Sequence, residues 1–217
     1  MNSKLLYSRV ATVACLMFGV ILPISIIGRQ EDLILKKEIS IQVKNVSLTH
    51  ILQTIAIENK IPIGIEEAIS FQPVNTDDIN SKMSLNIQQK EVGAVLNDLF
   101  TAESAYSWQV DDGVIIVKPK DPNRSITSIM LTRFQVSQAT EDEARQAVVN
   151  LPELQVKLKN IGISTGPVMI TKLGPPTSLT ITLDVKNVSL FNTLNRLAKI
   201  TYFWHIFYLD GKMYIVI

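Results

Sequence analysis

The hexapeptide VKNVSL occurs twice in this chain, at Val43–Leu48 and at Val185–Leu190. Its flanks extend the match to ISIQVKNVSLTHILQTIA (Ile39–Ala56) and ITLDVKNVSLFNTLNRLA (Ile181–Ala198). A segment repeated at this length is the signature of a repeated structural unit. The chain is therefore expected to contain two copies of one small fold.

Both copies of the repeat change their apolar spacing at the same serine. Before it, apolar residues alternate, which predicts a strand with one buried face. After it, they recur every three or four residues, which predicts an amphipathic helix. The serines are Ser47 and Ser189, and a serine at this place accepts a hydrogen bond from a free amide of the first helical turn. The hexapeptide is therefore interpreted as a strand end and a helix cap.

A third, diverged strand–helix segment lies between these two, at MSLNIQQKEVGAVLNDLF (Met83–Phe100). It is followed by AYSWQVDDGVIIVKP (Ala105–Pro119), which aligns with YFWHIFYLDGKMYIVI (Tyr202–Ile217). Both segments hold an Asp-Gly pair between two apolar runs, and this pattern predicts a hairpin because glycine accepts the positive φ of the turn. Each copy therefore reads strand, helix, strand, strand, helix, hairpin.

These patterns predict an α+β fold of two tandem small domains, each a mixed sheet with two helices in a β-α-β-β-α-β-β unit. The first module is expected over residues 38–120 and the second over residues 126–217, with residues 121–125 as the linker. The second module is also predicted to hold an insertion near 157–178, which is polar and rich in glycine and proline.

The first half of the second module matches the repeat least well. Ile126–Val136 predicts a strand and Ala139–Asn150 a helix, with Thr140 and Glu143 in capping-box spacing. Pro167–Leu173 is interpreted as the strand that follows.

Residues 1–30 are interpreted as a signal peptide or a signal anchor. A short basic start precedes Val10–Gly28, which is apolar and uncharged, and this layout is typical of export signals. The apolar run is long enough to anchor the chain in the inner membrane if it is retained. The single cysteine, Cys15, lies inside it, so the exported body is expected to contain no disulfide, thiol nucleophile or thiolate metal site.

The sequence shows no recognisable catalytic, cofactor or metal motif. His50 and His205 lack companions at metal-ligand spacing, and Gly162–Val168 lacks the Lys-Ser/Thr ending of a phosphate loop. The formal net charge of +1 also argues against nucleic acid as a partner, because phosphate binding needs a basic face. We therefore expect no enzyme activity, no cofactor and no metal.

Three segments resemble the secretin and TonB N-terminus short domain family: Val43–Ile65, Ser84–Pro119 and Leu183–Ile217. They carry its strand, its V-S-L helix and its aromatic hairpin with a glycine turn. The resemblance covers most of the first copy and the end of the second, and it implies a periplasmic protein-interaction module. Such a module normally precedes a channel or a receptor barrel. Because no such sequence follows here, a detached module or a partner of these machines is expected.

The aromatic run YFWHIFY (Tyr202–Tyr208) cannot place every ring on one face of a regular strand, so some rings are expected to face outward. Exposed aromatic side chains and an exposed strand edge are features that bind partners. The C-terminal strand, Met213–Ile217, is the candidate edge. The residues predicted to contact a partner are Trp204, Phe207, Tyr208, Met213, Tyr214, Ile215, Val216 and Ile217.

Together these features predict a periplasmic, non-enzymatic interaction module of the cell envelope. Its expected partners are a secretin, an outer-membrane receptor or an inner-membrane regulator, and a homo-oligomer is also considered. One alternative is a periplasmic protein that binds a small ligand or cell-wall glycan, with residues 157–178 as a lid. Another is an enzyme of unrecognised type.

Overall fold

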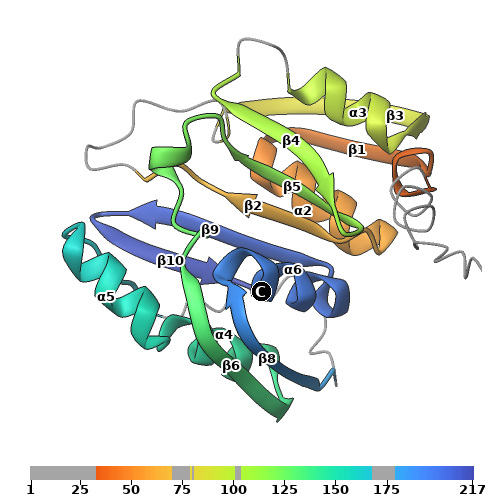
Figure 1. Cartoon of the computed structure of the whole chain (residues 1–217). Coiled ribbons are helices and arrows are strands. Elements are labelled where there is room, and N and C mark those ends of the chain that lie inside the picture. Colours follow the sequence, from red (N-terminus) through yellow and green to blue (C-terminus); the bar gives the residue numbers. More distant parts are fainter. Residues whose placement is uncertain (1–32, 70–78, 80, 101–103, 168–178) are drawn as a thin grey trace, which may run out of the picture.

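The computed structural model describes residues 33–69, 79, 81–100, 104–167 and 179–217. The predicted signal segment, most of the predicted strand Pro167–Leu173 and part of the predicted insertion lie outside these residues. The predicted mixed α/β fold is confirmed: helices pack on one six-stranded and two two-stranded sheets (Figure 1).

The first copy follows the predicted order of elements. Its elements are β1 (Glu38–Ser47), α2 (Leu48–Asn59), β2 (Ile63–Glu66), β3 (Lys82–Glu91), α3 (Val92–Leu99), β4 (Tyr106–Asp111) and β5 (Val114–Pro119). The linker that follows contains one short 3-10 helix, η2 (Pro122–Arg124).

The second copy adds one helix to this order. Its elements are β6 (Met130–Ala139), α4 (Glu141–Val149), α5 (Pro152–Asn160), β7 (Ser164–Thr165), β8 (Ile181–Ser189), α6 (Leu190–Thr201), β9 (Phe203–Leu209) and β10 (Lys212–Val216). The start of the predicted insertion, residue 157, lies inside α5, the helix that the first copy lacks. Leu154 and Leu158 explain the helix, since they lie one turn apart and are both buried.

The repeated hexapeptide has the same backbone in both places. The Ser47 and Ser189 hydroxyls accept from the amides of His50 at 3.2 Å and Asn192 at 3.1 Å, which confirms the predicted caps. Two residues before each serine, Asn45 and Asn187 have φ values of 56° and 53°. Asparagine is one of the few residues that adopt this left-handed conformation readily.

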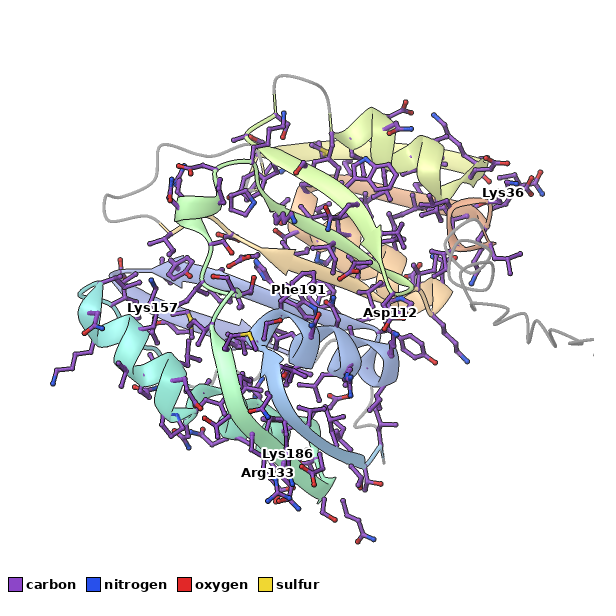
Figure 2. The ribbon with its side chains drawn as sticks, in the orientation of Figure 1. Lys36, Asp112, Arg133, Lys157, Lys186 and Phe191 are labelled. Atoms are coloured by element: carbon purple, nitrogen blue, oxygen red, sulfur yellow. The ribbon has the colours of Figure 1, made fainter. Side chains whose placement is uncertain are left out.

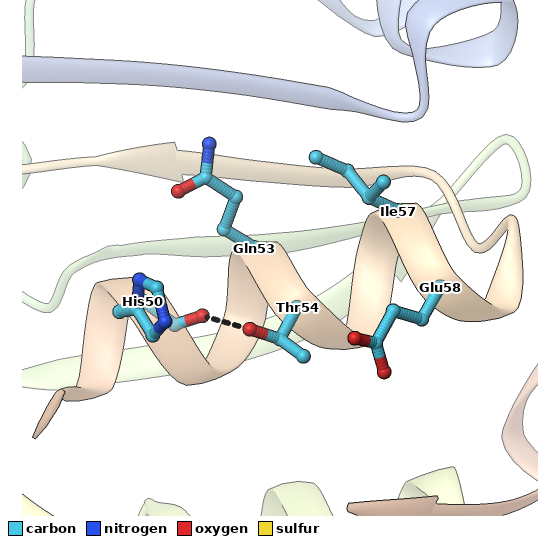
Figure 3. A pocket seen from close by; sticks show the side chains of 5 residues that line it. All are labelled: His50, Gln53, Thr54, Ile57 and Glu58. Atoms are coloured by element: carbon cyan, nitrogen blue, oxygen red, sulfur yellow. Dashed lines mark hydrogen bonds between the residues drawn. The ribbon is translucent and has the colours of Figure 1, made fainter. Parts of the chain in front are cut away.

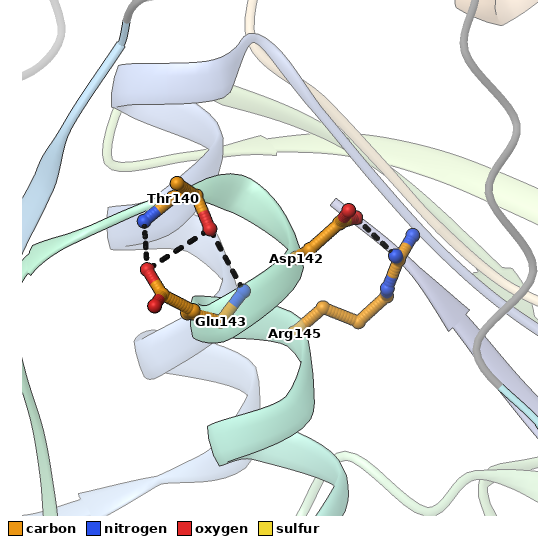
Figure 4. A network of polar contacts seen from close by, with 4 residues as sticks. All are labelled: Thr140, Asp142, Glu143 and Arg145. Atoms are coloured by element: carbon orange, nitrogen blue, oxygen red, sulfur yellow. Dashed lines mark hydrogen bonds and ion pairs between the residues drawn. The ribbon is translucent and has the colours of Figure 1, made fainter.

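The predicted capping box of α4 is also present (Figure 4). The Glu143 amide donates to Thr140 Oγ1 at 3.3 Å, and the Thr140 amide donates to Glu143 Oε2 at 2.8 Å. This bond from the Thr140 amide holds the pKa of Glu143 below its ordinary value. Beside it, Asp142 forms an ion pair with Arg145, whose side chain is buried.

The central sheet combines strands of both copies, in the order β4-β5-β2-β9-β10-β7. β2 pairs in parallel with β5 on one side and with β9 on the other. The trio β4-β5-β2 is therefore repeated as β9-β10-β7, with every strand direction reversed. The two trios are therefore related by a half-turn, a rotation of 180° about an axis that lies in the sheet and runs perpendicular to its strands.

The same half-turn places the two cores on opposite faces of the sheet. Ile63 and Ile65 of β2 belong to one core, packed with α2 and α3. Trp204 and Ile206 of β9 belong to the other, packed with α4 and α6. The central strands of the six-stranded sheet are thus buried on both faces.

Gly64 lies at the centre of this joint. A Cβ atom there would come within 2.2 Å of the Trp204 ring, and Trp204 is fully buried. We predict that Gly64→Ala lowers the free energy of unfolding by about 1–3 kcal/mol, the typical cost of overpacking a core. Chemical denaturation of both variants would measure this.

Gly93→Ala is the matched control, because the nearest atom to its Cβ, on Leu35, is 3.4 Å away in ordinary contact. Alanine also favours the α3 helix over glycine. An equal loss of stability in both variants would contradict the role given to Gly64.

Candidate interaction surface

The aromatic hairpin β9–β10 is mostly core. Trp204 is fully buried, and its indole Nε1 donates to Asn195 Oδ1 at 3.1 Å. The side chains of Met213, Tyr214, Ile215 and Val216 are also buried. Of the residues predicted to contact a partner, Phe207, Tyr208 and Ile217 are half-buried. The structure therefore gives most of these side chains a packing role.

The C-terminal strand does not end the sheet. β10 lies between β9 and β7, so the prediction that it offers the free edge needs correction. β7 pairs with it in parallel at Lys212 and Met213, and the Gly166 amide donates to the Met213 carbonyl at 2.8 Å. β10 is covered because α5 brings the chain back beside it: α5 contacts β7, and β7 pairs with β10.

A row of rings runs along one face of this hairpin. His205 stacks on Phe207, and Phe207 stacks on Tyr214, with ring centroids 5.0 Å apart in each pair. Phe203 lies next to His205 at a tilted 6.3 Å. The alternation along β9 puts these residues on the same side, as the period of a strand requires.

A buried carboxylate ties the second copy to the first. Glu66 is 1 % exposed and lies at the end of β2. It accepts hydrogen bonds from the amides of Ile126 at 2.6 Å and Thr127 at 3.0 Å. The hydroxyls of Ser125 and Thr127 each donate to it at 2.8 Å. Four donors satisfy the carboxylate, as burial of a charge demands.

Glu67 extends this polar cluster toward β9. His205 Nε2 lies 2.9 Å from Glu67 Oε1 across the joint between the copies. Nearby, the Tyr208 hydroxyl is buried and has no hydrogen-bond partner among the described residues. Burial, and then the charges of Glu66 and Glu67, raise the pKa of Tyr208 well above its ordinary value. Sequence spacing carried no signal for this cluster, because its members come from strands of different copies.

An ion pair at the surface also connects the copies. The Lys199 ammonium on α6 lies 2.6 Å from an Asp112 carboxylate oxygen. Asp112 lies at the tip of the first hairpin (Figure 2). The Asp112 side chain is largely exposed and the Lys199 side chain is partly exposed, and such surface pairs contribute little to stability.

A shallow groove lies on the outer side of α2 (Figure 3). Its lining residues are His50, Gln53, Thr54, Ile57 and Glu58. The Thr54 hydroxyl donates to the His50 carbonyl at 2.9 Å, and Ile57 is 41 % exposed. The groove therefore offers an apolar side chain and a few polar groups from a single helix.

The terminal strands of the six-stranded sheet are β4 and β7. In the described part of the chain, no strand pairs with their outer edges. Asp111 and Val114 flank a two-residue turn in the β4–β5 hairpin. The backbone groups of alternate residues therefore point away from β5, and Trp108 and Val110 are among these. At Trp108 and Val110, β4 thus presents an edge that no described strand covers, and strand-adding segments use such edges.

Among the described residues, no three His, Cys, Asp or Glu side chains are grouped so that they could hold a metal ion. Within the same residues, no helix has the length and apolar character needed to cross a bilayer. No protein-family model matches the chain, and no curated protein matches it in sequence.

We predict that Glu66→Gln lowers the free energy of unfolding by about 1.5–3 kcal/mol, because an amide nitrogen replaces an oxygen that accepts buried hydrogen bonds. Denaturant titration would measure the loss. Glu58→Gln is the control, since Glu58 is exposed on α2 and its change should stay within about 0.5 kcal/mol. Equal effects would show that Glu66 does not hold the joint.

Tyr208→Phe should behave in the opposite way. It removes a buried hydroxyl that finds no partner in the described part of the chain, so stability should stay constant or rise by up to about 1 kcal/mol. Thermal unfolding would test this. A clear drop in stability would mean that the hydroxyl makes a stabilising contact in solution.

Proposed function

We propose that this protein is an exported, non-enzymatic interaction module of the cell envelope, which binds components of a secretin or TonB-linked outer-membrane system. The resemblance of both copies to the short domains of such systems suggests the class of partner. The observation that carries the proposal is the edge of β4 at Trp108 and Val110, which no described strand covers, at one end of a sheet whose central strands are buried on both faces.

A free strand edge binds extended segments through main-chain hydrogen bonds, while the flanking side chains provide selectivity. Trp108 and Val110 pack against the core of the first copy and remain half-buried. On the other face of β4, Gln109 is exposed. The edge therefore combines an apolar side with a polar side, which favours a segment with alternating character.

The periplasm is the proposed compartment, because the apolar segment Val10–Gly28 follows a basic start. The glycan-binding alternative receives less support. Phe203, Trp204 and Tyr214 of the hairpin are buried, its other rings are partly buried, and among the described residues no Phe, Tyr or Trp lines the α2 groove.

The test is site-specific photocrosslinking of the full-length chain in its native host. A photoreactive phenylalanine replaces Gln109 on β4 and, in a matched control, Lys186 on β8, which is also exposed. We expect position 109 to form adducts that mass spectrometry identifies as a secretin, an outer-membrane receptor or an inner-membrane regulator. Equal adducts at both positions, or none at 109, would contradict the proposal.

A further inference from the structure

The chain itself contains an example of strand addition to the type of edge that β4 presents. The outer edge of β9 is occupied by β2, in parallel. The Ile63 amide donates to the Tyr202 carbonyl at 3.0 Å, and the Glu67 amide donates to the Ile206 carbonyl at 2.9 Å. The first copy thus supplies the strand that completes the sheet of the second.

β4 is the counterpart of β9. The closing pairs of the two hairpins, Asp111 with Val114 and Leu209 with Lys212, align the strands. Counting back from these pairs, Trp108 corresponds to Ile206, whose carbonyl accepts the bond from β2. The outward backbone groups of Trp108 therefore match groups that are bonded in the second copy.

β7 is likewise the counterpart of β2. Thr165 pairs with Met213, and Ile63 pairs with Ile115. Met213 and Ile115 each lie two residues after the glycine of their hairpin turn. Gly166 then corresponds to Gly64. Adding a Cβ to either glycine would place it 2.2 Å from a neighbouring ring, Trp204 for Gly64 and Tyr214 for Gly166. β2 and β7, each the last strand of its trio, thus both need glycine at this position.

The next position differs between the two copies. Ile65 pairs with His205, and the alternation of bonds along β2 points the Ile65 amide toward β9. Pro167 takes the corresponding place after β7 and has no amide hydrogen to donate. Proline at an outward position is a known means of closing a sheet edge. Without this proline, β7 of one chain could pair with β4 of the next chain. Such a head-to-tail contact would leave a free edge at each end and could continue from chain to chain.

We propose that the free edge of β4 binds the outer strand of another repeat of this same α+β kind, carried by a partner protein, and that Pro167 keeps the chain's own β7 from taking that place. This assignment rests on the proposed function and specifies its partner. The incoming strand runs parallel to β4. It has an apolar–Gly–apolar core like the Ile63–Ile65 segment of β2. The residue after its glycine carries an amide hydrogen, unlike Pro167, which follows Gly166.

The test restores that amide hydrogen. Full-length wild-type protein is compared with Pro167→Ile and Pro167→Ala by analytical ultracentrifugation over a concentration series, with circular dichroism as the folding control. We expect both variants to self-associate head to tail, so that the average mass at least doubles at concentrations where the wild type stays unchanged. If both variants fold normally and keep the wild-type mass, the proposal is overturned.

The contact itself is located with the photoreactive group at position 109. In Pro167→Ile, illumination should join position 109 of one copy to the β7 region of another, and the same group at position 186 should not form this adduct. Larger species without the adduct from position 109 would also overturn the proposal, because association would then use another surface.

The two proposals fail in different ways. If the proline variants associate through β4 but no envelope protein is captured in cells, the edge assignment stands and the cellular role falls. If envelope partners are captured while the proline variants do not associate, the cellular role stands. The partner would then bind β4 in another manner.

Discussion

The parallel pairing of β2 with β9 is the contact on which the rest of the structure depends. β2 is short, yet it lies between β5 and β9 and is buried on both faces. Because it pairs on both sides, it joins two three-stranded sheets into one and fixes the half-turn between them. The opposite placement of the two cores follows directly, since a half-turn about an axis across the strands exchanges the faces of a sheet.

The polar contacts at this joint reinforce the same arrangement. Glu66, at the end of β2, accepts hydrogen bonds from residues 125–127, and Glu67 is hydrogen-bonded to His205 on β9. These bonds cross between segments that are distant in sequence, and each buries a group that is costly to leave without a partner. The start of the second copy is thereby held against the end of β2, and the chain between the copies has little freedom to act as a loose linker.

Local signals predicted much of this fold because their physics is local. The serine caps, the Thr140–Glu143 capping box and the Asp-Gly turns each depend on a few consecutive residues. The prediction for the C-terminal strand needed correction for the opposite reason. Whether a strand lies at an edge depends on which distant strand arrives beside it, and here Ser164–Thr165 covers part of β10. The burial of Trp204 likewise depends on Asn195 and on α6, which approach it from outside the strand.

The sequence by itself determined the repeated unit, its caps, its turns and its mixed α/β class, because each of these depends on residues close together in the chain. Only the tertiary structure decided which edges are closed and which face outward. The hairpins of the two copies are similar in sequence, but one has its outer edge covered by β2 and the other has no partner strand among the described residues. That difference comes from the half-turn between the copies, which leaves β4 and β7 as the ends of the sheet. A free edge is a property of what surrounds a strand, so no pattern within the strand could specify it.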